Sequence, residues 1–167
     1  ILEPNARLSG NTAVHVAAKY NAFDVLEYFI DVKHVDVNLR NLNGEPLIFS
    51  AAEKPYMRII KFLIDERRAD PMMMDSNKDN ILFKSAKRGD LQLPKYLLDV
   101  KKMSFDLNWI DANGYTIVNL ASKYNKVGFV NYMIQKNASI FIADPLKRTP
   151  LHHAAAGGYF HLCKLLV

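Results

Sequence analysis

Residues 147–155 read Lys147-Arg-Thr-Pro-Leu-His-His-Ala-Ala155, and similar stretches occur four more times along the 167-residue chain. The best preserved of the others is Gly10-Asn-Thr-Ala-Val-His-Val-Ala-Ala18. The five copies begin at residues 10, 44, 78, 114 and 147, so successive copies are 34, 34, 36 and 33 residues apart. Self-similarity at such a period is typical of proteins in which every repeat is one supersecondary unit. The sequence therefore predicts five copies of one structural unit.

A second, amphipathic pattern follows every copy at a fixed distance. In the first repeat it spans residues 23–30, where apolar side chains recur at i, i+2 or i+3, i+6 and i+7. This spacing places the apolar side chains on one face of a helix. We expect equivalent helices at residues 57–64, 91–98, 127–134 and 160–167.

The repeated stretch itself predicts a shorter helix. Its small side chains, such as the pair Ala17 and Ala18, let neighbouring backbones pack closely. Threonine hydroxyls stand where an N-cap accepts a hydrogen bond from first-turn amides, at Thr12, Thr116 and Thr149. Residue types that tolerate a left-handed conformation end this helix in four repeats, at Asn21, Gly89, Asn125 and Gly158. Pro55 stands there in the second repeat, and because proline cannot adopt a positive φ, we expect a different turn.

Polar connectors join one repeat to the next. They contain segments such as Val35-Asp-Val-Asn38 and Phe105-Asp-Leu-Asn108, and turn-forming residues follow at 41–44, 75–77, 111–114 and 144–147. Asparagine, aspartate and glycine favour tight turns, through their side-chain hydrogen bonds or their conformational freedom. We therefore expect tight turns that project to one side of the helices.

With these features the chain resembles the ankyrin repeat, whose signature is Thr-Pro-Leu-His-x-Ala-Ala with a later Ala-Asp-x-Asn segment. The fifth repeat carries the clearest copy, residues 149–155 followed by Gly158, and the resemblance covers nearly the whole chain. Phenylalanine or asparagine replaces the signature histidine at Phe49, Phe83 and Asn119, and the signature threonine is replaced at Pro46 and Asn80. These departures concern the polar bridging between neighbouring repeats and not the fold. The tetratricopeptide repeat has the same period, but it lacks this connector and has a different aromatic pattern.

The resemblance implies an all-α fold, an ankyrin-repeat solenoid of helix–turn–helix units joined by β-hairpin-like turns. We expect a single domain over residues 1–167, with repeats at about 7–40, 41–74, 75–110, 111–143 and 144–167, the last one truncated. One repeat cannot bury its apolar face alone, and stacking against its neighbours does so. The chain begins at Ile1 and ends on Leu165, Leu166 and Val167 without a polar cap, so we interpret it as a piece of a longer protein.

The composition is that of an ordinary folded protein, with 50% hydrophobic and 23% charged residues. The single cysteine, Cys163, excludes an internal disulfide and favours a reducing setting, which we expect to be intracellular and cytoplasmic. No apolar run approaches the roughly 18 residues of a membrane span, and no signal-peptide pattern opens the sequence. The net charge of +5 favours acidic partners, although a solvated, slightly basic surface would carry the same charge.

The resemblance further implies that partners dock on the turn tips and on the exposed side of the first helices. The two positions after the Ala-Ala pair hold five basic residues, two tyrosines and one acid over the first four repeats. Cations beside tyrosines can pair with carboxylates or phosphates and stack on flat groups. Our hypothesis is an acidic, partly apolar peptide segment on the concave face, and the alternative is that these are solvated helix positions. The expected partner-binding residues are Lys19, Tyr20, Arg40, Lys54, Lys87, Arg88, Trp109, Tyr115, Lys123 and Tyr124.

No catalytic, cofactor or metal site is expected within these residues. His15 and His152 occupy the position at which the resemblance implies a histidine that caps and bridges turns, and His153 should point elsewhere. Cys163 aligns with mostly apolar positions of the other repeats, which indicates a packed thiol. A zinc site would need about four converging ligands. Glycine-rich phosphate loops, kinase signatures and serine-elbow motifs are absent from the sequence.

These observations favour a protein-interaction module with no enzymatic activity, no cofactor and no small-molecule substrate. A second interpretation is a regulatory or targeting segment of a larger enzyme or channel whose active domain lies outside this sequence. Nucleic-acid binding is disfavoured, because it calls for a dense basic stripe with stacking aromatics. Acids such as Glu53, Asp79 and Asp111 are expected on the same side as the basic residues. An enzyme within these residues has no supporting motif.

Overall fold

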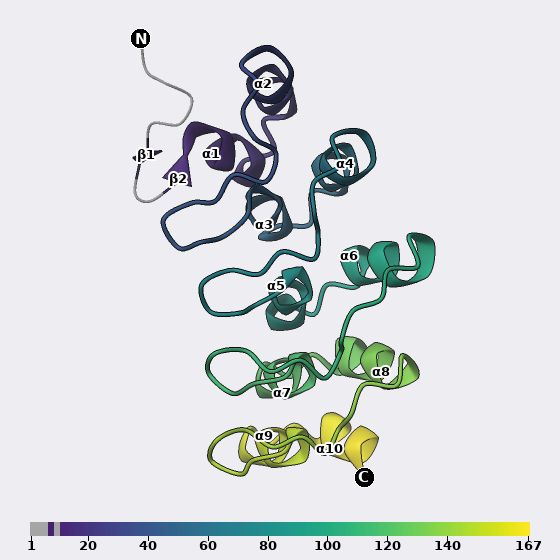
Figure 1. Ribbon diagram of the computed structural model, residues 1–167. Helices are drawn as coiled ribbons and strands as arrows, with labels where there is room; N and C mark the ends of the chain where they lie inside the picture. The colour runs from purple at the N-terminus through teal and green to yellow at the C-terminus, as the bar shows by residue number, and fades with distance from the viewer. Residues whose placement is uncertain (1–6, 9–10) are drawn as a thin grey trace. The chain divides into compact units, whose positions relative to one another are not determined.

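The computed structural model describes residues 7–8 and 11–167, and these residues form two compact units, one that ends at Ser76 and one that spans Asn77–Val167. Short helices dominate the described residues of both units (Figure 1). The expected all-α architecture of paired helices is confirmed. Gly10, with which the first copy of the repeated stretch begins, lies outside the described residues. A single domain over the whole chain stays a prediction.

Among its described residues, the first unit contains two helical pairs and one short strand pair. Its first helices are α1 (Ala13–Lys19) and α3 (Leu47–Ala52). Its second helices are α2 (Phe23–Glu27) and α4 (Met57–Lys61), which continue as the wider turns Tyr28–Val32 and Phe62–Glu66. Strand β1 (Arg7–Leu8) pairs antiparallel with β2 (Asn11–Thr12) just before α1.

The second unit contains three helical pairs. Its first helices, α5 (Ile81–Arg88), α7 (Ile117–Lys123) and α9 (Pro150–Ala156), form an inner column beside the turn loops (Figure 1). Its second helices form an outer column. They are α6 (Gln92–Lys95), which continues as the wider turn Tyr96–Val100, α8 (Val127–Gln135) and α10 (Phe160–Leu166).

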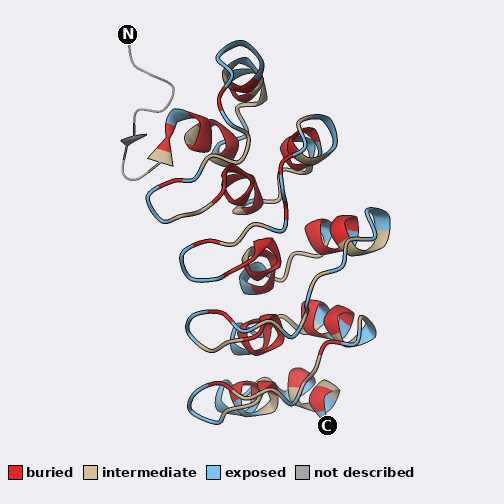
Figure 2. Ribbon diagram, viewed as in Figure 1, coloured by how far each residue is buried: buried red, intermediate tan, exposed pale blue. Residues whose placement is uncertain are grey.

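The core of each unit lies where inner and outer helices face each other (Figure 2). Phe49 and Phe62 are buried in the first unit, and Phe83 and Phe129 in the second. Buried aromatic side chains of this size each contribute roughly 2–3 kcal/mol through the hydrophobic effect. Phe49 and Phe83 stand at the signature histidine position, so an apolar side chain replaces the histidine in these two repeats. In the third repeat Asn80 caps α5 instead, since its side-chain oxygen accepts from the Leu82 amide at 3.0 Å.

The ends of the first helices follow the expectation from residue type. Asn21, Gly89, Asn125 and Gly158 all have a positive φ, between 55° and 77°. The second repeat is built differently, as Pro55 requires, because none of residues 53–56 has a positive φ. The Tyr56 amide still donates to the Ala51 carbonyl at 3.3 Å, as the equivalent amides of the other repeats do. Both expectations are confirmed.

The ends of the second helices were not expected from the sequence pattern. In the first three repeats the last turn widens, so that the amides of Lys33, Arg67 and Lys101 donate five residues back, at 3.2, 3.1 and 2.9 Å. The next residue then adopts a positive φ, and these residues are His34, Arg68 and Lys102. The wide turn accommodates one residue more than an α-helical end would, and the chain still enters its connector in the same direction.

The turns between repeats are hairpin-like, as predicted. The amides of Asn41, Asp111 and Asp144 donate to the carbonyls four residues ahead, at distances of 2.9 to 3.0 Å. Neighbouring turns are also joined along the backbone, since the Ala112 amide donates to the Asn77 carbonyl at 2.8 Å in the second unit. These loops project from the inner helices on the side away from the outer helices (Figure 1). They fix where the turn-tip side chains stand.

Candidate functional site

The inner-helix ends of the first unit carry a charge pair. The Lys19 ammonium lies 2.8 Å from a carboxylate oxygen of Glu53. Hydrogen bonding to Glu53 raises the pKa of Lys19, so this lysine stays protonated. Two of the expected contact residues remain open to solvent here, Tyr20, with 68% of its surface exposed, and Lys54. The sequence placed these residues at equivalent positions, but it gave no sign that Lys19 and Glu53 neutralise each other.

Arg40 is an exposed turn residue whose guanidinium is already engaged within the first unit. It donates to the carbonyls of Gly44 in its own turn and of Met74 in the next one. The side chain therefore links two successive turns. Its role as a contact residue stays a prediction, and the structure adds a stabilising role.

The inner-helix ends of the second unit present an open group of cations. Lys87, Arg88 and Lys123 are exposed at the ends of α5 and α7, and Tyr124 is 46% exposed beside them. The Lys87 ammonium lies 3.6 Å from the Asp79 carboxylate, whose side chain is buried. We call Lys87, Arg88, Lys123 and Tyr124 the inner basic face. Of the two groups of predicted contacts, this one combines several exposed cations with an exposed aromatic ring.

Tyr115 adds an aromatic platform to this face from the turn before α7. The Lys123 ammonium lies 5.1 Å from the centre of the Tyr115 ring, a cation–π distance. The ring centre lies 5.8 Å from that of His153, and an Arg148 N–H donates to the Tyr115 hydroxyl at 3.4 Å. The ring is therefore held between groups from the fourth and fifth repeats.

Trp109 is half-buried in the connector before the same turn. Its indole N–H donates to the Lys78 carbonyl at 2.8 Å. This hydrogen bond fixes the ring against the preceding turn while part of the side chain stays accessible. The geometry is compatible with the predicted contact role, which stays a prediction.

Asp144 organises the last turn, a role that the sequence pattern did not reveal. Its buried carboxylate accepts hydrogen bonds from the backbone amides of Leu146 and Arg148 and from Arg148 Nε, each at 2.9 Å. His153 Nε2 lies 3.1 Å from Asp144 Oδ2. Burial alone would raise the pKa of Asp144, but the hydrogen bonds and charge of Arg148 outweigh it and lower the pKa to about 2. Asp144 therefore stays ionised beneath the Tyr115 platform.

The two neighbouring histidines of the last repeat do different things. His152 is exposed, and its Nδ1 accepts from the Thr149 amide at 3.2 Å and lies 2.8 Å from the Thr149 hydroxyl, which is the expected capping arrangement. His15 stands in the same way 2.7 Å from the Thr12 hydroxyl. His153 points elsewhere, as expected, and is buried against Asp144.

The burial of His153 predicts a measurable pH dependence of stability. Burial lowers its pKa, an effect opposed by the charge of Asp144 and reinforced by that of Arg148. Because the folded pKa lies below the unfolded value of about 6.5, protonation favours the unfolded state. The stabilisation is complete above that value and is lost as the pH falls through it. Chemical denaturation between about pH 7.5 and 5.5 should show a smaller loss of stability for H153Q than for the parent chain.

H161Q is the matched control for this prediction, because His161 is exposed on α10. It should keep the parental dependence on pH. An H153Q variant whose stability falls as steeply as that of the parent chain would show that His153 is not the responsible group.

Asn119, which stands where the signature has histidine, provides polar bridging between neighbouring repeats. Its amide nitrogen donates to the Ile142 carbonyl at 3.1 Å and the Arg148 carbonyl at 3.4 Å, and thereby ties the fourth repeat to the connector and turn of the fifth. The Thr116 hydroxyl accepts from the backbone amide of Asn119 at 3.1 Å and thereby caps the helix. An asparagine therefore performs the bridging that the resemblance assigns to histidine.

Other kinds of site find no support in the described residues. Within residues 7–8 and 11–167, no three histidine, cysteine, aspartate or glutamate side chains are grouped as metal ligands would be. In the same part of the chain, no helix has the length and apolar character required to cross a bilayer. Cys163 is half-buried on α10, so it is less enclosed than the pattern indicated.

Comparison with known proteins agrees with the repeat architecture. A family model described as ankyrin repeats in three copies matches residues 2–75 and 47–144, and a single ankyrin-repeat model matches residues 147–167. The chain is also similar to "Probable protein S-acyltransferase 23" of Arabidopsis thaliana, with 37% identity over 59 residues. That match covers 35% of this chain and 11% of the plant protein. Ankyrin repeats are protein-interaction modules and generally have no catalytic activity of their own. The chain belongs to the ankyrin-repeat family.

Proposed function

We propose that this protein binds an acidic, partly apolar segment of a partner protein through its inner-helix ends and turn tips. The observation that carries the proposal is the inner basic face of the second unit. There, Lys87, Arg88 and Lys123 are exposed beside Tyr124, and the Tyr115 ring lies under Lys123. Cations provide charge-assisted hydrogen bonds to carboxylates, and the rings provide apolar area at little entropic cost.

The first unit supports a smaller contribution to the same function. Lys19 is paired with Glu53, and Arg40 is engaged with two turns, so Tyr20 and Lys54 are the freer contacts there. We expect the partner segment to bind mainly to the second unit. We also propose that the five repeats form one domain.

A second candidate function is regulation or targeting within a larger enzyme. The similarity to part of a plant protein named as a probable protein S-acyltransferase motivates it, because only 11% of that protein is matched. In this case the same inner basic face would recruit a substrate protein or contact a neighbouring domain. The two proposals share the binding surface and differ in what lies beyond these residues.

Selection from a random peptide library displayed on phage tests the proposal, because the selection itself identifies the peptides that the chain binds. The intact chain should enrich peptides that combine aspartate or glutamate with leucine or aromatic residues. A variant with Tyr20, Arg88 and Tyr124 replaced by alanine should lose this enrichment, because it removes two exposed rings and one cation while leaving the core intact. Enriched peptides without acidic residues, or equal enrichment by the variant, would contradict the proposal.

A further inference from the structure

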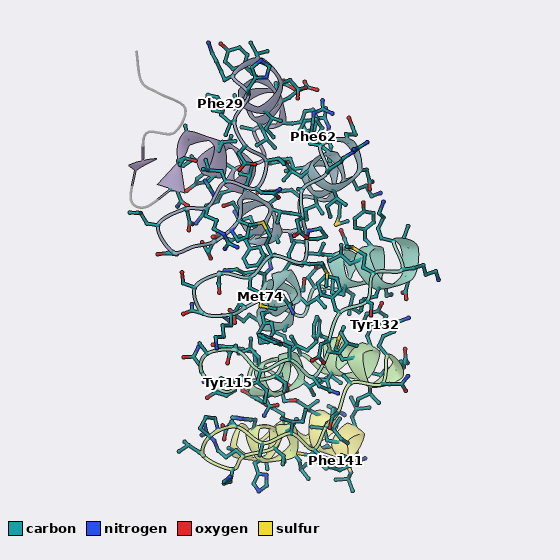
Figure 3. All side chains as sticks on the ribbon, in the orientation of Figure 1. Phe29, Phe62, Met74, Tyr115, Tyr132 and Phe141 are labelled. Atoms are coloured by element: carbon teal, nitrogen blue, oxygen red, sulfur yellow. The ribbon has the colours of Figure 1, made fainter. Side chains whose placement is uncertain are left out.

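A cavity of 510 Å³ opens on the outer side of the second unit, away from the inner basic face. One wall comes from the third repeat and contains Leu91, Lys95 and Asp99. The other wall comes from α8 and contains Gly128, Asn131 and Tyr132, and Gln135 and Lys136 complete the lining. We call this cavity the outer groove. Tyr132 belongs to α8, in the outer column of the second unit (Figure 3).

The first unit shows why this groove is open. Arg58 occupies the same repeat position as Gly128, and Phe23 the same position as Leu91. In the first unit the Arg58 guanidinium stacks on the Phe23 ring, 3.8 Å from its centre, and covers the space between α2 and α4. At Gly128, by contrast, an added Cβ would meet no atom within 4 Å. Glycine thus leaves vacant a position that a long side chain covers in the first unit.

The floor of the outer groove is an ordered aromatic and ionic group. Tyr132 is buried, and its hydroxyl donates to Asp99 Oδ2 at 3.0 Å. The Lys136 ammonium pairs with Asp99 Oδ1 and lies 5.6 Å from the centre of the Tyr132 ring. The Asp99 charge is therefore already balanced by Lys136, and the tyrosine ring is fixed by its hydrogen bond to Asp99.

One cation of the groove remains in excess. The exposed Lys95 ammonium lies 5.9 Å from the centre of the Tyr132 ring, above the same floor. With Asp99 balanced by Lys136, Lys95 leaves the outer groove with one net positive charge. The exposed amide groups of Asn131 and Gln135 add hydrogen-bond donors on the opposite wall, and Leu91 adds apolar surface.

We propose that the outer groove binds an acidic side chain, together with an apolar neighbour, from a short segment of a partner protein. The carboxylate would pair with Lys95 and accept from the amides of Asn131 or Gln135. The apolar neighbour would lie on Leu91 and the Tyr132 ring. The cavity volume lies within the range of roughly 300–1,000 Å³ that ligand sites occupy, which suits a few residues rather than a whole domain. This site is separate from the inner basic face and does not depend on it.

The test uses the full chain carrying K87E, R88E and K123E, which disables the inner basic face. The probe is a fluorescein-labelled hexapeptide of alternating glutamate and leucine, and binding is followed by fluorescence polarisation and by the NMR signals of the Gly128 amide and the Asn131 and Gln135 side-chain amides. We expect saturable binding that shifts these signals. A peptide with glutamine in place of glutamate should bind about tenfold more weakly, because it lacks the charge.

Two pairs of variants distinguish the effect of filling the outer groove from the effect of changing its charge. G128Q introduces a long side chain, of the type that Gln92 has at the same repeat position, and should weaken binding about tenfold, whereas G128A should keep it within about twofold. K95E should weaken binding about tenfold, and K164E, on α10 outside the groove, should not. Peptide binding that is indifferent to both G128Q and K95E, or that leaves the groove signals unmoved, would overturn the proposal.

The outcome is independent of the proposed function. If the inner basic face fails in its own test, the hexapeptide should still bind at the outer groove. If the outer groove fails, G128Q and K95E have no effect, while the three inner substitutions still weaken the binding of selected acidic peptides to the otherwise native chain.

Discussion

An acidic peptide selected by the intact chain is expected to bind about a hundredfold more weakly when Lys87, Arg88 and Lys123 are all replaced by glutamate. Each of these side chains is exposed at an inner-helix end of the second unit. Loss of a charge-assisted contact at an exposed position costs about 1 kcal/mol, so three losses correspond to about 3 kcal/mol. That free energy is a factor of about one hundred in Kd.

The matched control carries the same change of net charge on other surfaces. Lys33, Lys102 and Lys164 are exposed and lie at or beyond the second helices. K33E/K102E/K164E should lower the affinity only through long-range attraction, and this part should disappear at high salt, because the Debye length falls to about 3 Å at 1 M. Peptide titration at low and high salt therefore distinguishes the loss of direct contacts from the effect of net charge on the affinity. Equal weakening by the two triple variants at both salt concentrations would contradict a role for the inner basic face.

Replacement of Phe83 by alanine is expected to lower the free energy of unfolding by about 3–5 kcal/mol. Phe83 is completely buried in α5, at the position where the signature has histidine. Removing the ring loses its transfer free energy and leaves a cavity that the packed surroundings cannot fully close. Denaturation by guanidinium chloride, followed by circular dichroism, measures the change.

F141A makes the same substitution where the ring is 79% exposed, in the connector after the fourth repeat. It should change the free energy of unfolding by no more than about 0.5 kcal/mol. If F83A cost less than about 1 kcal/mol, Phe83 would not be the core residue that the structure shows. The comparison tests whether packing of the Phe83 ring in the core stabilises the third repeat.

The parts of the fold that the sequence predicted are those set by local chemistry. Positive φ values at Asn21 and Gly89 follow from residue type, and the different turn at Pro55 follows from a fixed ring. The helical pairs follow from apolar spacing. By contrast, the widened turns that end at Lys33 and Arg67 depend on how many residues must fit between a helix and its connector, and periodicity alone does not count them.

The candidate site could be predicted only as a set of equivalent positions. Alignment of the repeats places Lys19 and Lys87 at the same position, yet their partners differ. Lys19 pairs with Glu53, whereas the Lys87 ammonium lies 3.6 Å from the buried carboxylate of Asp79. Such pairings depend on the distance between residues of different repeats, which a repeat pattern does not contain. The same holds for Asn119, whose side-chain amide donates to the carbonyls of Ile142 and Arg148, both more than 20 residues ahead in the chain.

The most direct test of the central claim is hydrogen–deuterium exchange of the full chain, with and without a saturating acidic peptide from the display selection. If the inner-helix ends bind the partner, exchange should slow at residues 87–89 and 123–125 and around Tyr115 when the peptide is present. Unchanged exchange in those segments, together with tight peptide binding, would place the partner elsewhere and contradict the account.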